Sequence, residues 1–169
     1  MGLDMYLEKH THVQRWDHIP HDKQYAVTVT RGGEPYAPIK PERVSYVIEQ
    51  VAYWRKANQI HRWFVENVQH GEDDCAPYYV TVEQLRELLT VVRQAIEVYK
   101  GNRANDSALA GALEELLPTE RGFFFGSLEY DEDYLIDLED TRDALEPILA
   151  GHEGSGEPTD ASYYYRASW

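Results

Sequence analysis

The chain has 169 residues, 43% of them hydrophobic, and it carries 16 Lys and Arg against 30 Asp and Glu. This length is typical of one domain that forms a hydrophobic core without disulfides, and Cys75 is its single cysteine. We therefore expect a single domain over residues 1–169, located in a cytoplasm. The first residues mix charged and apolar side chains, unlike a signal peptide, and no stretch is apolar enough to span a membrane. No membrane partner is expected.

The charge is unevenly distributed. Residues 1–70 carry nine Lys and Arg against eight Asp and Glu, whereas residues 71–169 carry seven against twenty-two. Binding to a phosphate backbone needs clustered cations, so the acidic second half argues against a nucleic-acid partner. An acidic surface also keeps a protein in solution, and it can bind a basic surface of another protein. An acidic inhibitor of a host factor is therefore one alternative function.

The N-terminal part contains two alternating segments. Leu3, Met5 and Leu7 alternate with polar or amphipathic residues, a period of two that predicts a strand. Tyr25–Thr30 alternates in the same way and predicts a second strand, followed by a turn at Arg31–Glu34. Three prolines then predict an extended loop: Pro35, Pro38 and Pro41.

The apolar stripe changes sides within residues 41–69. On a helical wheel the apolar residues before Ala52 lie opposite those after it. Either two elements meet near Ala52, which we favour, or one helix is buried on opposite faces at its two ends. Residues 44–52 fit either a helix or a strand, because Val and Ile dominate them, and the second element is a helix with Gly71 at its C-terminal end.

A long helix follows. Thr81 and Gln84 form a capping box, and a regular apolar face predicts a helix that stops before Gly101. A shorter helix is expected over residues 107–117, ended by Pro118.

The C-terminal part combines a helix with two strand-like segments. Phe123–Phe125 predicts a short buried strand, and Asp131–Asp133 predicts a helix N-terminus. We expect Pro147 to kink or end this helix, a flexible loop over about 151–162, and a strand at Tyr163–Trp169. The predicted fold class is α+β: a small, mostly antiparallel sheet made by the chain ends, packed with a helical middle.

One polar face stands out as a ligand site. If residues 54–65 are helical, four polar residues lie opposite the apolar face, flanked by Trp54: Arg55, Asn58, Gln59 and Arg62. Guanidinium groups bind phosphate, amides bind base edges or ribose hydroxyls, and an indole stacks on a ring. The alternative is a solvated helix face on which Arg62 pairs with Glu66.

A second cluster follows that helix. Asp73 and Asp74 can hold a divalent ion or orient a ligand hydroxyl, and near the N-terminus four histidines lie within twelve residues: His10, His12, His18 and His21. Their spacing matches no structural zinc pattern, so we assign neither a metal nor a cofactor. A metal-dependent hydrolase that uses these acids and histidines is the enzymatic alternative.

Several segments together carry a resemblance. Six segments are similar to a family of small proteins encoded by bacteriophages and bacteria. Two of them are the start Met-Gly-Leu-Asp-Met-Tyr-Leu and the core Trp-Arg-Lys-Ala-Asn-Gln-Ile-His within Trp54–Val65. The other four are Gly71–Cys75, Leu116–Thr119, Gly122–Ser127 and Tyr130–Asp131. The resemblance implies a phage-associated setting, and hence a host cytoplasm, but no reaction.

From the polar face and this setting we expect a non-enzymatic binder of a small phosphorylated or nucleotide-like ligand. Small phage proteins of this size include ones that sequester nucleotide signals of bacterial immunity, and such a sponge needs no catalysis. The predicted binding residues are Trp54, Arg55, Asn58, Gln59 and Arg62, with Asp73 and Asp74 as a secondary site.

Overall fold

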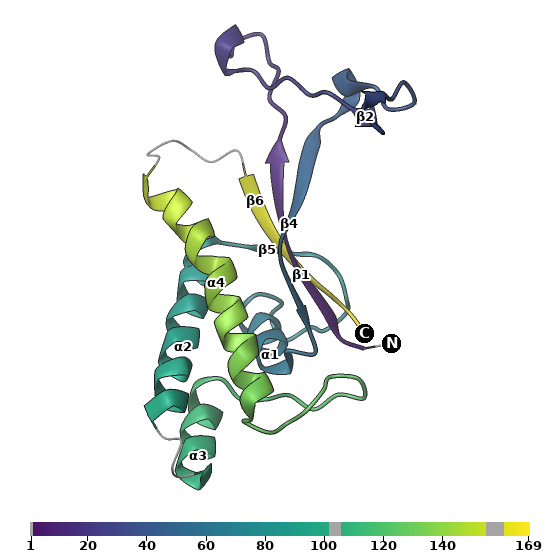
Figure 1. Cartoon of the computed structure of the whole chain (residues 1–169). Helices are drawn as coiled ribbons and strands as arrows, with labels where there is room; N and C mark the ends of the chain where they lie inside the picture. Colours follow the sequence, from purple (N-terminus) through teal and green to yellow (C-terminus); the bar gives the residue numbers. More distant parts are fainter. Residues whose placement is uncertain (1, 102–105, 155–160) are drawn as a thin grey trace.

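Four strands form one antiparallel sheet from segments far apart in the sequence. The structure is a computed structural model that describes residues 2–101, 106–154 and 161–169. The sheet order is β4-β1-β6-β5, built from β1 (Asp4–His12), β4 (Tyr46–Arg55), β5 (Tyr78–Val80) and β6 (Ala161–Ser168). Because β1 and β6 pair in the centre, the two ends of the chain lie side by side (Figure 1). The predicted α+β class and the strands at both chain ends are confirmed.

The helices come from the middle of the chain. They are α1 (Asn58–Asn67), α2 (Val82–Gly101), α3 (Asp106–Leu116) and α4 (Glu132–Gly154), and α2 packs against both α3 and α4 (Figure 1). The capping box of α2 is confirmed, since the Thr81 and Gln84 side chains each accept the other's backbone N–H at 3.1 and 2.9 Å. The apolar face of α2 is buried along its whole length.

The core lies between one face of the sheet and the helices. Met5 pairs with Trp54 on one side and Ala167 on the other, and Leu7 pairs with Ala52 and Tyr165 in the same way. All these side chains are buried, and so are Ile60 and Phe64 of α1 and the inner face of α4. The alternate residues Tyr6, Glu8 and Arg166 face away from this core, as expected for a sheet covered on one side.

An arm of residues 13–45 projects from the top of the sheet (Figure 1). Arg15 ties its base together, because its guanidinium donates to the carbonyl oxygens of Pro41 at 2.8 Å and Val44 at 3.3 Å. The arm contains two single 3-10 turns, at His21–Lys23 and Pro41–Arg43, and a two-stranded ribbon of β2 (Thr30–Arg31) and β3 (Glu34–Pro35).

The predicted strand at Tyr25–Thr30 is wrong except at its last residue. The turn after it is confirmed, since Gly32 and Gly33 both have positive φ angles, of 62° and 88°, as a tight hairpin requires. The ladder stops after two residues on each side, and no strand of the described chain pairs with residues 25–29. Alternation alone therefore did not make a strand here, because the segment has no sheet partner.

The change of element within residues 41–69 is confirmed, but it lies later than predicted. Residues 46–55 form the strand β4, and α1 begins at Asn58. The apolar residues before Ala52 do not form a buried stripe, since Val47 and Ile48 are 44% and 56% exposed. The β1–β4 register is irregular at this point and skips Val51. Gly71 does not cap α1 directly, because the helix ends at Asn67. Instead, the Gly71 N–H donates to the Val65 carbonyl oxygen at 2.8 Å and closes the turn that follows the helix.

Three further predictions need correction. Phe123–Phe125 is a turn and not a buried strand: the Phe125 N–H donates to the Gly122 carbonyl oxygen at 3.3 Å, and Phe123 is 92% exposed. Pro147 does not end α4, which continues to Gly154, while the kink at Pro147 stays a prediction. The flexible loop predicted at 151–162 is therefore helical at its start and part of β6 at its end, and residues 155–160 lie outside the described residues.

No helix within the described ranges has both the length and the apolar character needed to cross a bilayer.

Candidate functional site

Trp54 and Arg55 do not lie on the helix to which the polar face assigned them. Both belong to β4, so their side chains point to opposite faces of the sheet. Trp54 is 3% exposed, and its indole N–H donates to Thr141 Oγ1 of α4 at 2.8 Å. This tryptophan joins the sheet to α4 and has no free ring face for a ligand.

Three of the five predicted residues meet at one pocket. Arg55, Asn58 and Gln59 line a pocket of about 400 Å³, which we call the Asp137 pocket. Four carboxylates share its wall: Glu129, Asp131, Asp133 and Asp137. This concentration of negative charge opposes phosphate binding there, although Arg55 and Lys56 supply two cations.

Asp137 is the most perturbed carboxyl group of this pocket. Its pKa is raised to about 6, mainly by burial and also by the neighbouring Asp140, Asp133 and Asp131, against the lowering effect of a 3.0 Å hydrogen bond from Gln59 Nε2. Gln59 is itself buried. The Gln59 amide is thus committed to holding α1 against α4.

The Asn58 side chain is fully committed to the chain itself. Its Nδ2 donates to the carbonyl oxygens of Phe125 and Ser127 at 3.1 and 2.7 Å, and its Oδ1 accepts the Glu120 N–H at 2.9 Å. We call residues 119–127 the Phe123 loop. Asn58 therefore fixes this loop against α1 and has no group left for a ligand.

Arg62 faces a different side of α1. Its Nε donates to Glu66 Oε1 at 2.8 Å, and its Nη1 lies 3.6 Å from Glu120 Oε2 and 3.4 Å from the Thr119 carbonyl oxygen. The Arg62–Glu66 pair weighed as the alternative to a ligand site is thus present. Arg62 is separated from the Asp137 pocket, and the single face predicted by the helical wheel does not form.

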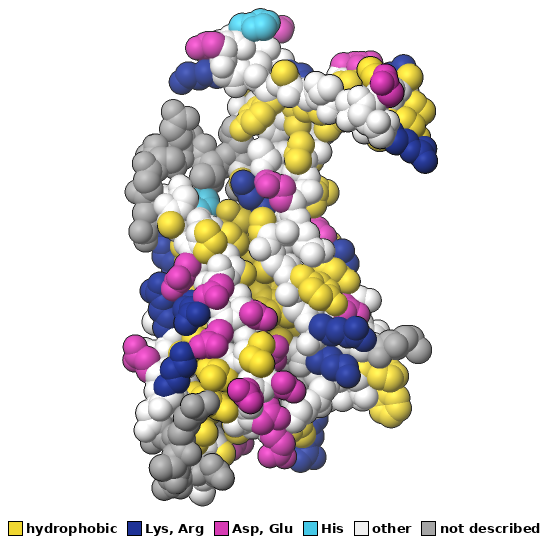
Figure 2. Space-filling view, viewed as in Figure 1, with side chains coloured by type: hydrophobic (Ala, Val, Ile, Leu, Met, Phe, Trp, Pro, Cys, Tyr) yellow, Lys and Arg dark blue, Asp and Glu magenta, His cyan; other side chains and the backbone are white. Residues whose placement is uncertain are grey.

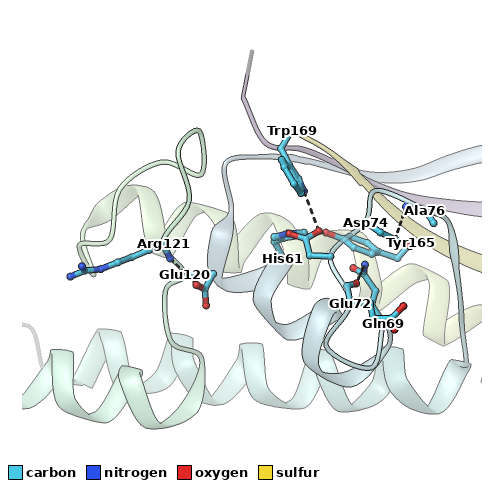
Figure 3. Close-up of polar contacts among 10 residues, drawn as sticks. His61, Gln69, Glu72, Asp74, Ala76, Glu120, Arg121, Tyr165 and Trp169 are labelled. Atoms are coloured by element: carbon cyan, nitrogen blue, oxygen red, sulfur yellow. Dashed lines mark hydrogen bonds and ion pairs between the residues drawn. The ribbon is translucent and has the colours of Figure 1, made fainter.

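A chain of buried polar groups lies beside Arg62. His61 is 1% exposed; its Nδ1 lies 2.7 Å from the Tyr165 hydroxyl and its Nε2 lies 3.0 Å from Asp73 Oδ2. The Trp169 indole N–H donates to Asp73 Oδ1 at 3.1 Å (Figure 3). Segments from α1, from the loop after it and from the C-terminal strand therefore converge on one carboxylate.

The hydrogen bonds assign the roles within this chain. An ionised Asp73 accepts only, so His61 Nε2 carries the hydrogen and Nδ1 accepts from the Tyr165 hydroxyl. Complete burial raises the pKa of Tyr165 well above its usual value, which keeps that hydroxyl protonated as a donor. Both ring nitrogens of His61 are thus occupied, and the Asp73 carboxylate is the group that remains partly exposed.

The Asp73 carboxylate opens on a largely aromatic pocket. This pocket, which we call the Phe123 pocket, has a volume of about 420 Å³ between α1, the Phe123 loop and the C-terminal residue. Its aromatic walls are Phe123, Phe124, Phe125 and Trp169. Phe123 is almost fully exposed and contacts Phe124 edge to face, with ring centroids 4.5 Å apart.

Two arginines border the Phe123 pocket. Arg62 is paired with Glu66 and Glu120 as described, whereas the Arg121 guanidinium has no ion pair with any described residue. The Arg121 side chain extends from the Phe123 loop away from His61 (Figure 3). A ligand in this pocket meets aromatic rings, the carboxylates of Glu66, Asp73 and Glu120, and the guanidinium groups of Arg62 and Arg121.

Asp74 does not share the position of Asp73. Its Oδ1 accepts the Ala76 N–H at 3.0 Å and so closes the loop locally. The four N-terminal histidines are also separate: His10 pairs with Glu8, and His12 and His18 pack on Trp16. Across residues 2–101, 106–154 and 161–169, no three His, Cys, Asp or Glu side chains come together in a way that could hold a metal ion.

Sequence reasoning missed His61, Tyr165, Trp169 and Phe123 as members of one site. His61 did give a local signal, because it sits next to the apolar stripe of α1 and is polar among buried neighbours. A polar residue at such a position needs a buried partner. The partners are 12 and 104 residues away along the chain, so the sequence pattern alone did not identify them.

No protein-family model matches the chain, and neither a curated protein nor a solved structure is significantly similar to it.

Proposed function

We propose that the protein is a non-enzymatic binder of a small nucleotide-like ligand, and that this ligand occupies the Phe123 pocket. The observation that carries the proposal is an aromatic pocket of about 420 Å³ with a carboxylate held in place by two hydrogen bonds at its wall. Ligand sites in proteins are typically concave and apolar with a few oriented polar groups.

The aromatic walls fit a planar ring. Phe123 is 92% exposed and Trp169 is 49% exposed, so both have ring surface available for stacking. Such exposure of a large apolar ring is unfavourable in water and is relieved when a ligand ring covers it. A purine or pyrimidine base supplies a ring of this kind.

The polar groups fit the rest of a nucleotide. Asp73 accepts hydrogen bonds and is oriented by His61 and Trp169, which suits ribose hydroxyls. Arg121 supplies a guanidinium for a phosphate, with Arg62 nearby. Of the binding residues expected from the sequence, this assignment retains Arg62 and Asp73. It leaves Arg55, Asn58 and Gln59 outside the binding site.

Binding without turnover agrees with the state of His61. Both of its ring nitrogens are hydrogen-bonded to groups of the chain, so neither is free to accept a proton from a ligand. The sequence resembles a family of proteins encoded by bacteriophages and bacteria. In that setting, we propose that the protein retains a nucleotide signal.

The test is thermal unfolding of the purified protein against linear nucleotides, cyclic nucleotides and the matching nucleosides. A ligand present at a hundredfold excess over its Kd stabilises the native state by about 2.7 kcal/mol. We expect stabilisation by at least one nucleotide and a weaker effect of its nucleoside, because the nucleoside lacks the group that Arg121 binds. No stabilisation by any nucleotide contradicts the proposal.

Variants locate the site. Phe123→Ala and Arg121→Ala each remove a side chain that we assign to the ligand, so each should weaken binding at least tenfold. Both side chains are exposed, so neither substitution should lower the Tm of the free protein. Arg55→Ala is the matched control, since it removes an exposed cation from the Asp137 pocket. Loss of binding in Arg55→Ala with normal binding in Phe123→Ala would assign the ligand to the Asp137 pocket instead.

A further inference from the structure

The strand β4 forms a free edge of the sheet. In the order β4-β1-β6-β5, β4 pairs with β1 on one side, and no described strand pairs with its other side. At ten residues, β4 is also the longest strand of the sheet. Alternate residues of an edge strand direct their N–H and C=O groups outward, where another strand can bind them.

The outer half of β4 exposes apolar side chains on both faces. Tyr46, Val47 and Ile48 are 55%, 44% and 56% exposed. Consecutive residues of a strand point to opposite faces, so neither face of this segment is covered. The helices cover the lower part of β4, where Ala52 and Trp54 are buried, and do not reach this segment.

More exposed apolar surface lies in the adjoining arm. Trp16, Tyr25 and Ile39 are 51%, 41% and 47% exposed. Together with Tyr46, Val47 and Ile48 they make up half of the large hydrophobic residues exposed in the described chain. Figure 2 shows hydrophobic side chains gathered where the strands enter the arm. Exposed apolar groups that gather in one region are typical of an interface.

The usual protection of an edge strand is missing from residues 46–50. The segment contains no proline, and its one charged residue, Glu49, is paired with Lys9 of β1 at 3.3 Å. The bulge that would twist the strand away from a partner lies further along, at Val51. The opposite edge of the sheet, β5, is three residues long, against the five residues of this segment.

We propose that β4 pairs antiparallel with β4 of a second copy of this chain, about a two-fold axis at Ile48. The two sheets then form one continuous sheet across an isologous interface. In this register Ile48 faces its own copy, Val47 faces Glu49, and Tyr46 faces Gln50.

The sequence of the segment makes it self-complementary. With the axis at Ile48 no charged residue faces a like charge, and an apolar pair lies at the centre. An axis at Glu49 instead places two carboxylates opposite each other, which is unfavourable. Lys9 pairs with Glu49 within each copy, so the one carboxylate of this segment is compensated at the contact.

Sedimentation equilibrium of the full chain tests the association. We expect a concentration-dependent mass of twice 19.6 kDa. Ile48→Lys places two cations together at the axis and should leave a monomer with an unchanged Tm at low concentration. Tyr79→Lys is the matched control, because Tyr79 on β5 is also 56% exposed and should leave the dimer intact. A wild-type chain that stays monomeric at every concentration, or an Ile48→Lys dimer, overturns the proposal.

Cross-linking tests the register. In a Cys75→Ser background, Ile48→Cys should form an interchain disulfide under mild oxidation, because the two Cα atoms face each other across the axis. Tyr46→Cys should not, since its partner position is Gln50. Cross-linking of Tyr46→Cys but not of Ile48→Cys overturns this register, and a complex that forms only with another protein overturns the self-association.

Discussion

Asn58 and Phe125, which are 67 positions apart, are joined by a 3.1 Å hydrogen bond from the Asn58 amide to the Phe125 carbonyl oxygen. The same amide group also binds Ser127, and its oxygen accepts the N–H of Glu120. One buried side chain at the first turn of α1 therefore holds a loop of nine residues. That loop separates the Phe123 pocket from the Asp137 pocket and contributes residues to both.

Asn58→Ala should destabilise the protein and loosen the Phe123 loop. The substitution leaves two carbonyl oxygens and one N–H without their partner, and each buried unsatisfied group costs about 1–3 kcal/mol. We expect a loss of about 2–4 kcal/mol in the free energy of unfolding, measured with urea. Asn67→Ala is the control, because the Asn67 side chain makes a single hydrogen bond, to the Trp63 carbonyl oxygen of its own helix, and its loss should cost under about 1 kcal/mol. Equal losses in the two variants would contradict this role of Asn58.

Gly126→Ala should also be destabilising, for a steric reason. Gly126 has a φ of 99°, and a Cβ there would lie 3.0 Å from Lys56 Cβ and 3.1 Å from the Lys56 carbonyl oxygen. Lys56 has little freedom to move, because its own φ is 64° and its N–H is bound to the Leu3 carbonyl at 2.8 Å. We expect a loss of about 1–3 kcal/mol.

The matched control for Gly126 is Gly111→Ala in α3. A Cβ at Gly111 meets nothing within 4 Å, so alanine gains helix propensity of about 0.5–1 kcal/mol without a clash. The two Gly-to-Ala variants should therefore shift the Tm in opposite directions. A Tm increase in Gly126→Ala would show that the turn tolerates a side chain.

The sequence predicted best those elements whose signal lies within a few neighbouring residues. The capping box and the apolar face of α2, the N-terminal strand and the acidic start of α4 follow from neighbouring residues, and all were predicted correctly. Tyr25–Thr30 has the same alternation as a strand but lacks a partner, which only the tertiary structure decides.

The candidate site was harder to predict, because its residues come from distant segments. The helical wheel assumed that Trp54 and Arg55 are helical, and their place on β4 separates them from Arg62. Asp73 was a candidate from the sequence, but its partners His61 and Trp169 meet it through packing of the C-terminal strand beside α1. No local pattern contains that information.

The N-cap of α2 gives a prediction that tests the reading of the capping box. Thr81→Ala removes the acceptor for the Gln84 N–H and should cost about 1 kcal/mol. Thr90→Ala on the same helix is the control: Thr90 is exposed and its hydroxyl binds back to the Arg86 carbonyl at 2.8 Å, so alanine should be neutral or slightly stabilising. Urea unfolding of both variants measures the difference, and a larger loss in Thr90→Ala would contradict the prediction.

Asp137 predicts how stability depends on pH. The pKa of Asp137 rises from 3.8 to about 6 on folding, mainly because of burial. Between these values the folded state holds a proton that the unfolded chain has released, so the free energy of unfolding falls as the pH rises. At about 1.4 kcal/mol per pKa unit, Asp137 should lower the stability by roughly 2–3 kcal/mol between pH 4 and pH 7.

Asp137→Asn isolates this contribution. Asparagine cannot ionise, and its oxygen still accepts the bond from Gln59 Nε2 that Asp137 makes at 3.0 Å. Urea unfolding should therefore show the variant close to wild type near pH 4 and more stable than wild type by about 2 kcal/mol near pH 7. The rest of the chain is identical in the two proteins, so the difference between them reports Asp137 together with its coupling to Asp131, Asp133 and Asp140. A variant that is less stable than wild type at pH 7 would mean that the ionised carboxylate is stabilised in the folded state, with a pKa below 3.8.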